Sequence, residues 1–171
     1  HGNHDGDLNS QLNAHRGIDD KPIANDDADS MRVVVDAMLT EAGRVLKKDC
    51  CCCCCCGGGG PRPTFAWLAT RMDSGEMQFF HSVIWDKVNP GLGWRFRRQH
   101  EMIMVAHRRG GKLLWADDSK AIANVMKFSK EREAEHPNQK PLPLMQRFIE
   151  AHTTPGQIVL DPFKIGRASC R

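Results

Sequence analysis

The chain has 171 residues, of which 40% are apolar and 26% charged, and its formal net charge is +3. This length and apolar content predict one domain of ordinary size with its own core. No apolar run is long enough to cross a bilayer and no signal peptide is recognisable, so we expect no membrane protein. The first residue is His1 rather than Met, which predicts that the natural protein begins upstream.

Basic residues gather in the middle of the chain. Only two acidic residues, Asp86 and Glu101, accompany them. The stripe consists of Lys87, Arg95, Arg97, Arg98, Arg108, Arg109 and Lys112. Such a stripe suits the phosphates of a nucleic acid, and the alternative is an ordinary solvated face.

The N-terminal part of the chain predicts a polar loop followed by a helix. Residues 1–28 are rich in Asp, Asn, Gly and His, which is typical of loops. Ser30 is a suitable N-cap, and Lys47 and Lys48 suit the C-terminal end of a helix. The apolar residues that share one side of this helix are Val34, Val35, Met38, Leu39, Ala42, Val45 and Leu46.

A run of seven cysteines, Cys50–Cys56, follows the helix. Such a run argues against an oxidising compartment, where the thiols would mispair. Contiguous side chains on a strand alternate between its faces, so they do not converge on one zinc ion. We therefore predict a strand that is buried on both faces, and metal binding is the alternative.

The remaining pattern predicts alternating helices and strands, and hence the α/β class. We expect helices over Pro63–Arg71 and Leu142–His152, the second with Leu144, Met145, Phe148 and Ile149 on its inner face. Residues 116–135 fit no single element. The expected strands are Gln78–Trp85, His100–Arg108, Leu113–Trp115 after a Gly110-Gly111 turn, and Gln157–Leu160.

The C-terminal third contains "HPNQKPLPLMQRFIEAHTTPGQIVLDPF". A Pro-bounded loop leads into a helix and then a strand that ends at Asp161, where a carboxylate can meet a ligand at the sheet edge. His136 and Lys140 supply donors nearby. The alternatives are that Asp161 caps the next helix, that His136 holds the loop and that Lys140 is solvated.

Together, these residues resemble the amino-group DNA methyltransferases of the β circular order. In that family HPxQKP directly precedes the S-adenosylmethionine loop DPFxGSGT. The resemblance implies a Rossmann-like, three-layer α/β fold with a mostly parallel sheet, here incomplete. It also implies cofactor-binding roles for His136, Pro137, Gln139, Lys140, Pro141, Asp161, Pro162 and Phe163.

Two further blocks are similar to the same family. "IWDKVNPGLGWRFRRQHEMIMVAHR" resembles a family segment, WxKxNP…RFRxxHE, that lies near the target base and the DNA backbone. "RVLKKDC" resembles, more weakly, a helix that ends in RVLKPGG. For Trp85, stacking on an extruded base and a place in the core are equal alternatives. The matched positions imply a DNA and target-base region of Trp85, Lys87, Asn89, Arg95, Phe96, Arg97, Arg98 and His100, and Glu101 also matches.

The resemblance implies transfer of a methyl group from S-adenosylmethionine to an exocyclic amino nitrogen of a flipped base in double-stranded DNA. N6-adenine is favoured, and N4-cytosine is the alternative. The family's catalytic motif, (D/N/S)PP(Y/F), is absent from the sequence. We therefore assign no catalytic residue and expect residues 1–29 to be a polar loop just after that motif, residues 30–163 a partial methyltransferase domain, and the chain to be inactive alone.

The last residues depart from the family pattern. "IGRASCR" stands where GSGT belongs, and its codons fit a common short-read sequencing adapter, so we predict that residues 164–171 are not native. The alternative is a divergent loop. We further expect a bacterial or phage-infected cytoplasm and a role in restriction–modification, and we leave open whether the protein forms a homodimer.

Other classes of function remain as alternatives. A non-catalytic nucleic-acid-binding module would use the basic stripe without any effect of a cofactor. An RNA methyltransferase on the same fold is a second alternative, and a metal-binding protein that uses Cys50–Cys56 is a third.

Overall fold

The computed structural model describes residues 28–56, 64–91, 95–119, 121–130 and 139–163. The chain divides into two compact units, residues 1–34 and residues 35–171. All the elements below belong to the second unit, apart from the first residues of one helix. The predicted polar loop, apart from its last residues, and the predicted non-native tail lie outside the described residues, as do His136 and Pro137.

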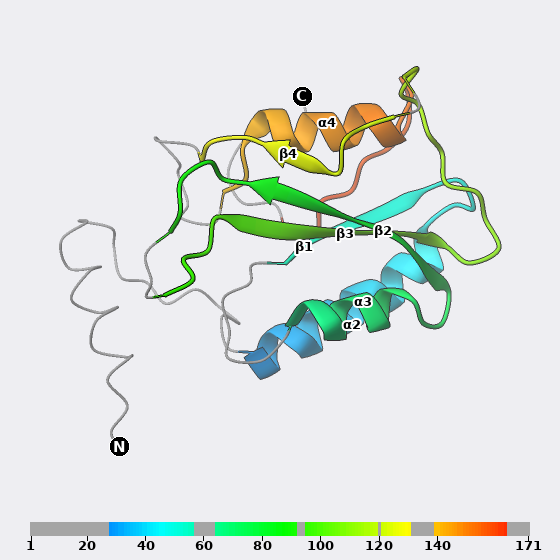
Figure 1. Cartoon of the computed structure of the whole chain (residues 1–171). Coiled ribbons are helices and arrows are strands. Elements are labelled where there is room, and N and C mark those ends of the chain that lie inside the picture. The colour runs from blue at the N-terminus through cyan, green and yellow to red at the C-terminus, as the bar shows by residue number, and fades with distance from the viewer. Residues whose placement is uncertain (1–27, 57–63, 92–94, 120, 131–138, 164–171) are drawn as a thin grey trace. The chain divides into compact units, whose positions relative to one another are not determined.

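The described residues form three helices and four strands (Figure 1). All but one of them, β4, fall on segments where the sequence predicts that kind of element. Their bounds are α2 (Ala28–Val45), β1 (Cys51–Cys56), α3 (Thr64–Met72), β2 (Met77–Asp86), β3 (His100–Arg108), β4 (Val125–Lys127) and α4 (Leu142–His152). The helix α4 and the strand β3 have the predicted bounds, and β4 lies in the segment that the sequence left unassigned.

The strands form one mixed sheet with the order β1-β3-β2-β4. The strand β3 is antiparallel to both β1 and β2, whereas β2 and β4 are parallel. Among the described strands the sheet is therefore mixed rather than mostly parallel as predicted. The reason is local, because β2 and β3 follow each other along the chain and pair directly as antiparallel neighbours.

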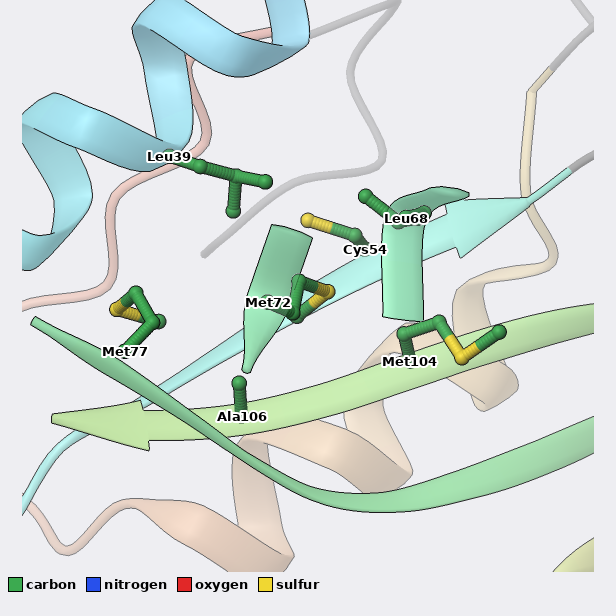
Figure 2. Close-up of a cluster of buried hydrophobic side chains, with 7 residues drawn as sticks. All are labelled: Leu39, Cys54, Leu68, Met72, Met77, Met104 and Ala106. Carbon is green, nitrogen blue, oxygen red and sulfur yellow. The ribbon is translucent and has the colours of Figure 1, made fainter. Parts of the chain in front are cut away.

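Alternate side chains of β3 enter two separate cores. Met104 and Ala106 point to the face that carries α3 and the part of α2 from Val35 onward. This first core comprises Leu39, Cys54, Leu68, Met72, Met77, Met104 and Ala106 (Figure 2). Ile103 and Val105 belong to a second core of Val83, Trp85, Ile103, Val105, Leu144 and Phe148. The helix α4, which contributes Leu144 and Phe148, lies on the opposite face of the sheet from α3 (Figure 1). The two-residue period of a strand thus produces a sheet covered on both faces.

The predicted strand Leu113–Trp115 is not found. Its backbone instead bonds elsewhere, because Leu114 N donates to Asp49 O (3.1 Å) and Ala116 N donates to Ala151 O (2.8 Å). Both edges of β3 are already occupied by β1 and β2, so a further strand has no place beside it. The Gly110-Gly111 turn is found, and a Cβ on Gly111 would lie 1.9 Å from Lys48 O, so only glycine fits there.

The predicted buried strand Gln157–Leu160 is also not found. The segment has no regular structure, and 93% of Ile158 and 73% of Leu160 is exposed. A strand that is apolar on both faces needs a sheet neighbour and two covering layers. The described part of the chain pairs no strand with this segment, so its apolar side chains stay in solvent.

The cysteine strand forms as predicted, but it is not buried on both faces. Cys54 is buried and Cys53 is exposed, and the two thiols alternate across β1. The strand pairs with β3 along one side, which places it at an edge of the described sheet.

Among the described helices, none is long and apolar enough to cross a membrane.

Candidate functional site

The two specific sequence blocks meet at the carboxylate of Glu101. Its Oε2 lies 3.0 Å from Lys140 Nζ, and its Oε1 lies 3.5 Å from Lys87 Nζ. The three side chains are mostly withdrawn from solvent, with 13% of Glu101, 11% of Lys87 and 24% of Lys140 exposed. A carboxylate between two ammonium groups holds the start of α4 against the ends of β2 and β3.

Trp85 forms the apolar base of this cluster. Lys140 Nζ lies 5.7 Å from the centre of the Trp85 ring, within the range of a cation–π contact. The indole is only 1% exposed, and its Nε1 donates to Phe128 O at 2.7 Å. Of the two alternatives for Trp85, the structure therefore supports the core residue, because the ring presents no free face for a base to stack on.

Pro141 restricts the backbone next to Lys140, the residue that pairs with Glu101. Pro141 is buried and has φ −58°, and it is the residue just before α4. Pro141 O accepts from Leu144 N at 3.1 Å, while the Leu144 side chain is fully buried in the second core. The first turn of α4 is thus anchored, so the neighbouring Lys140 has a fixed path toward Glu101.

The segment between β2 and β3 is organised by Asp86. Its Oδ1 accepts from Gln99 Nε2 (2.9 Å) and from Val88 N (2.8 Å), and these two hydrogen bonds hold the pKa of the Asp86 carboxyl below its ordinary value. Val88 and Arg95 have φ of 69° and 61°. A β-branched residue in the left-handed region is strained, so the surrounding contacts fix the backbone of this segment.

The Arg97 side chain also donates hydrogen bonds to the backbone of this segment. Its Nε donates to Gly91 O (2.9 Å) and its Nη2 donates to Pro90 O (3.4 Å). Its neighbours point outward, and Phe96 is fully exposed. The exposed members of the predicted DNA region are Asn89, Arg95, Phe96, Arg97, Arg98 and His100.

The far end of the basic stripe is structural. Arg108 donates to Leu46 O at 3.1 Å. Arg109 donates to the carbonyl oxygens of Asp73, Gly75 and Met77 at 2.8–3.0 Å. Arg108 and Arg109 thus support neighbouring backbone, although Arg109 and Lys112 are exposed, whereas Arg95, Arg97 and Arg98 form a group of exposed cations in the segment between β2 and β3.

The predicted residues at the C-terminal end are not brought to Glu101. Asp161, Pro162 and Phe163 are exposed, and Asp161 Oδ1 accepts from Phe163 N at 3.0 Å. This is a local turn in which the Asp side chain bonds the backbone two residues further on. Of the eight predicted cofactor residues, Lys140 contacts the β2–β3 block, through Glu101 and Trp85, and the buried Pro141 follows it directly.

Glu101 was not among the predicted site residues, although this residue matches the family segment. The sequence feature that could have pointed to Glu101 is that it is an acidic residue within the basic stripe.

A cavity of about 490 Å³ lies elsewhere, against α4, and is lined by residues that include Phe80, Val83, Trp115, Met126, Arg147 and Phe148. None of the predicted site residues lines it. Among the described residues, no group of three or more His, Cys, Asp or Glu side chains could hold a metal ion.

Comparison with known proteins gives one family. The sequence profile described as "DNA methylase" matches residues 13–167. The type II methyltransferase M.HhaII of Haemophilus parahaemolyticus is 31% identical over 82 residues, which cover 47% of this chain and 35% of the relative. The chain thus spans about a third of the length of this curated relative.

Two solved structures have a similar fold. The M1.HpyAVI–SAM complex superposes with a TM-score of 0.64 at 20% identity, over 77% of this chain and 66% of the other. M1.HpyAVI gives a TM-score of 0.61 at 19% identity, over 77% of this chain and 64% of the other. This likeness confirms the predicted Rossmann-like α/β fold class.

Proposed function

The chain belongs to the DNA methylase family of amino-methyltransferases, and on that premise we propose that it is part of an enzyme that methylates DNA site-specifically. The methyl group comes from S-adenosylmethionine and goes to an exocyclic amino nitrogen, with N6-adenine favoured over N4-cytosine. Double-stranded DNA is the partner, and the setting is a restriction–modification system in a bacterial or phage-infected cytoplasm. The support is the family match together with the site described above.

The observation that carries the proposal is the contact of Glu101 with Lys87 and Lys140. A block that resembles the cofactor segment and a block that resembles the target-base segment are far apart in sequence. In the structure one carboxylate joins them at 3.0 and 3.5 Å. A methyl transfer requires the methyl donor and the acceptor to be held side by side, which is the arrangement that such a link favours.

On the cofactor side, the residues would bind S-adenosylmethionine through its charged amino-acid part. Lys140 keeps 24% of its side chain exposed beside the buried Pro141, which suits contact with a carboxylate. Asp161 presents an exposed carboxylate that suits an ammonium group. His136, Pro137 and Gln139, then Pro162 and Phe163, complete the proposed set. The cofactor supplies an activated methyl group when bound.

On the DNA side, the outward part of the segment between β2 and β3 would contact the duplex. Arg95 and Arg98 offer cations to phosphates, whereas the exposed Phe96 offers a ring to a base. Arg97 would in addition support the segment, because its guanidinium donates to the Pro90 and Gly91 carbonyls. We therefore propose phosphate contact through Arg95 and Arg98, with Arg97 as a support for the segment.

Fluorescence anisotropy with a labelled duplex at increasing salt tests the proposal. We expect the affinity to fall as salt rises, and Arg98→Ala to reduce the slope of log K against log salt by about one, as for the loss of one phosphate contact. Phe96→Ala should weaken binding without changing the slope. Arg44→Ala is the matched control, because Arg44 is exposed on α2 and pairs locally with Glu41.

Two results would contradict the proposal. One is an affinity that does not depend on salt, and the other is an equal loss for Arg98→Ala and Arg44→Ala. Added S-adenosylmethionine separates the methyltransferase from a non-catalytic DNA-binding module. The proposal expects the cofactor to strengthen DNA binding by the unaltered chain and not by Lys140→Ala, whereas the binding module predicts no effect of the cofactor on either.

A further inference from the structure

One face of β1 presents thiols to a core that is rich in sulfur. Cys52 and Cys54 are two residues apart on the strand, so their side chains share a face. Their Sγ atoms are 3.8 Å apart. Both side chains belong to the first core, where Cys54 is buried and the partly buried Cys52 packs against the buried residues.

The other sulfur atoms of this core are thioethers. Met72 and Met104 are buried with Cys54, at 0% and 2% exposure (Figure 2). Met104 is also the residue of β3 that pairs with Cys54 across the sheet. Met77 is a third buried thioether of this core. The face therefore combines two thiols with thioethers, and its remaining buried members, Leu39, Leu68 and Ala106, offer no hard ligand.

The separation of the two thiols suits a shared metal ion. A disulfide would need the sulfurs at about 2.05 Å. Two metal–sulfur bonds of about 2.3 Å that meet at a tetrahedral angle place their sulfurs about 3.8 Å apart. The observed 3.8 Å between Cys52 and Cys54 thus needs no movement of the strand to admit an ion.

We propose that Cys52 and Cys54 bind copper(I), with the thioether of Met104 or Met72 completing the site. Thiolate and thioether ligands favour copper(I) over harder cations. Zinc requires more thiolate, imidazole or carboxylate ligands than this face offers. In binding, each thiol loses its proton to solvent and forms one sulfur–copper bond, so two protons leave and copper keeps its oxidation state. Cys52, the less buried of the two thiols, provides the route for the ion and the protons.

The competing explanation is that the thiols are only small apolar core residues. The opposite face of the same strand provides a matched comparison. Cys51 packs against the second core, while Cys53 is exposed. Replacing Cys51 and Cys53 removes as many thiols as replacing Cys52 and Cys54, but it leaves the proposed site intact.

The experiment titrates the reduced, oxygen-free chain with copper(I) against a chromogenic copper(I) chelator. We expect the unaltered chain and Cys51→Ala/Cys53→Ala to take one copper ion tightly, and Cys52→Ala/Cys54→Ala to lose that binding. Replacing both candidate thioethers, Met72→Leu/Met104→Leu, should weaken binding roughly tenfold or more, at least the scale found when groups around metal ligands are removed. Equal binding by the two double variants, or no tight copper in the unaltered chain, would overturn the proposal.

A second measurement does not depend on the variants folding. X-ray absorption at the copper edge of the loaded, unaltered chain should show sulfur ligands alone. Nitrogen or oxygen ligands in the first coordination sphere would place the copper elsewhere and refute the site.

Discussion

Glu101 shows how one side chain can hold two segments together. Its two carboxylate oxygens contact Lys140 at 3.0 Å and Lys87 at 3.5 Å, and most of the surface of all three side chains is withdrawn from solvent. Removing the charge of a withdrawn carboxylate leaves its cationic partners without compensation, and this is the costly way to break such a pair. The cluster therefore stabilises the arrangement that we propose for the cofactor and the base.

The first prediction concerns this residue. Glu101→Gln keeps the shape but removes the charge, so Lys87 and Lys140 lose their common partner. We expect the free energy of unfolding, measured by urea denaturation, to fall by about 1–3 kcal/mol, less than for a fully buried pair because Lys140 retains some exposure. Glu41→Gln is the control, because the pair between Glu41 and Arg44 is exposed and should contribute below about 1 kcal/mol. Equal effects of the two changes would contradict a special role for Glu101.

At the scale of residues, the sequence indicated which residues belong to a functional segment but not which residues they contact. The blocks around Lys87 and Lys140 could be singled out because their patterns match a family. No local pattern shows that the two lysines share Glu101, because that contact depends on how α4 packs against the sheet. Trp85 illustrates the same limit, since an aromatic residue at a strand end fits a base or a core equally well until its burial is known.

At the scale of elements, the pattern of apolar residues predicted three helices and two of the strands, because each of them buries one face or stripe against a neighbour, and the run of cysteines predicted the third strand. Two strand predictions were wrong, and in both cases the reason lies in the surrounding sheet rather than in the sequence of the segment. Leu113–Trp115 meets a sheet whose neighbouring edges are occupied, and Gln157–Leu160 has no neighbouring strand among the described residues. The short strand β4 was not predicted because three residues carry too little periodicity.

The second prediction concerns the C-terminal end of α4. His152 is buried there, its Nδ1 lies 3.2 Å from Leu114 O, and burial lowers the pKa of its imidazole. The folded chain therefore binds this proton less readily than the unfolded chain, whose histidine titrates near pH 6.5. The contribution to stability is complete above about pH 6.5 and is lost as the pH falls toward the lower pKa of the folded chain.

Urea unfolding between pH 7.5 and pH 5.5 measures this effect. We expect His152→Gln to lose less stability over this range than the unaltered chain. His81→Gln should retain the original pH dependence, because His81 is exposed. If His152→Gln and His81→Gln gave the same slope as the unaltered chain, the buried imidazole would not be the source of the pH dependence.

At the scale of the whole molecule, the proposed function gives this chain positions for a cofactor and for DNA, but its sequence lacks the motif that acts on the amino nitrogen in the family. In the family that it resembles, the first residue of (D/N/S)PP(Y/F) accepts a hydrogen bond from the target amino group. No such motif occurs among the 171 residues. The remaining contacts would hold reactants without orienting the nitrogen lone pair, and that orientation is a large part of the acceleration.

The last prediction follows from this division of roles. Incubation of the purified chain with duplex DNA and methyl-labelled S-adenosylmethionine should give no incorporation above the level without protein, even where the same preparation binds DNA in a salt-dependent manner. M.HhaII in the same assay provides the positive control. Incorporation by the chain that was abolished by Lys140→Ala would contradict its inactivity and show that the Glu101 cluster positions the cofactor in an active enzyme. Incorporation that was unchanged by Lys140→Ala would place the chemistry outside this cluster and remove the main support for the proposed site.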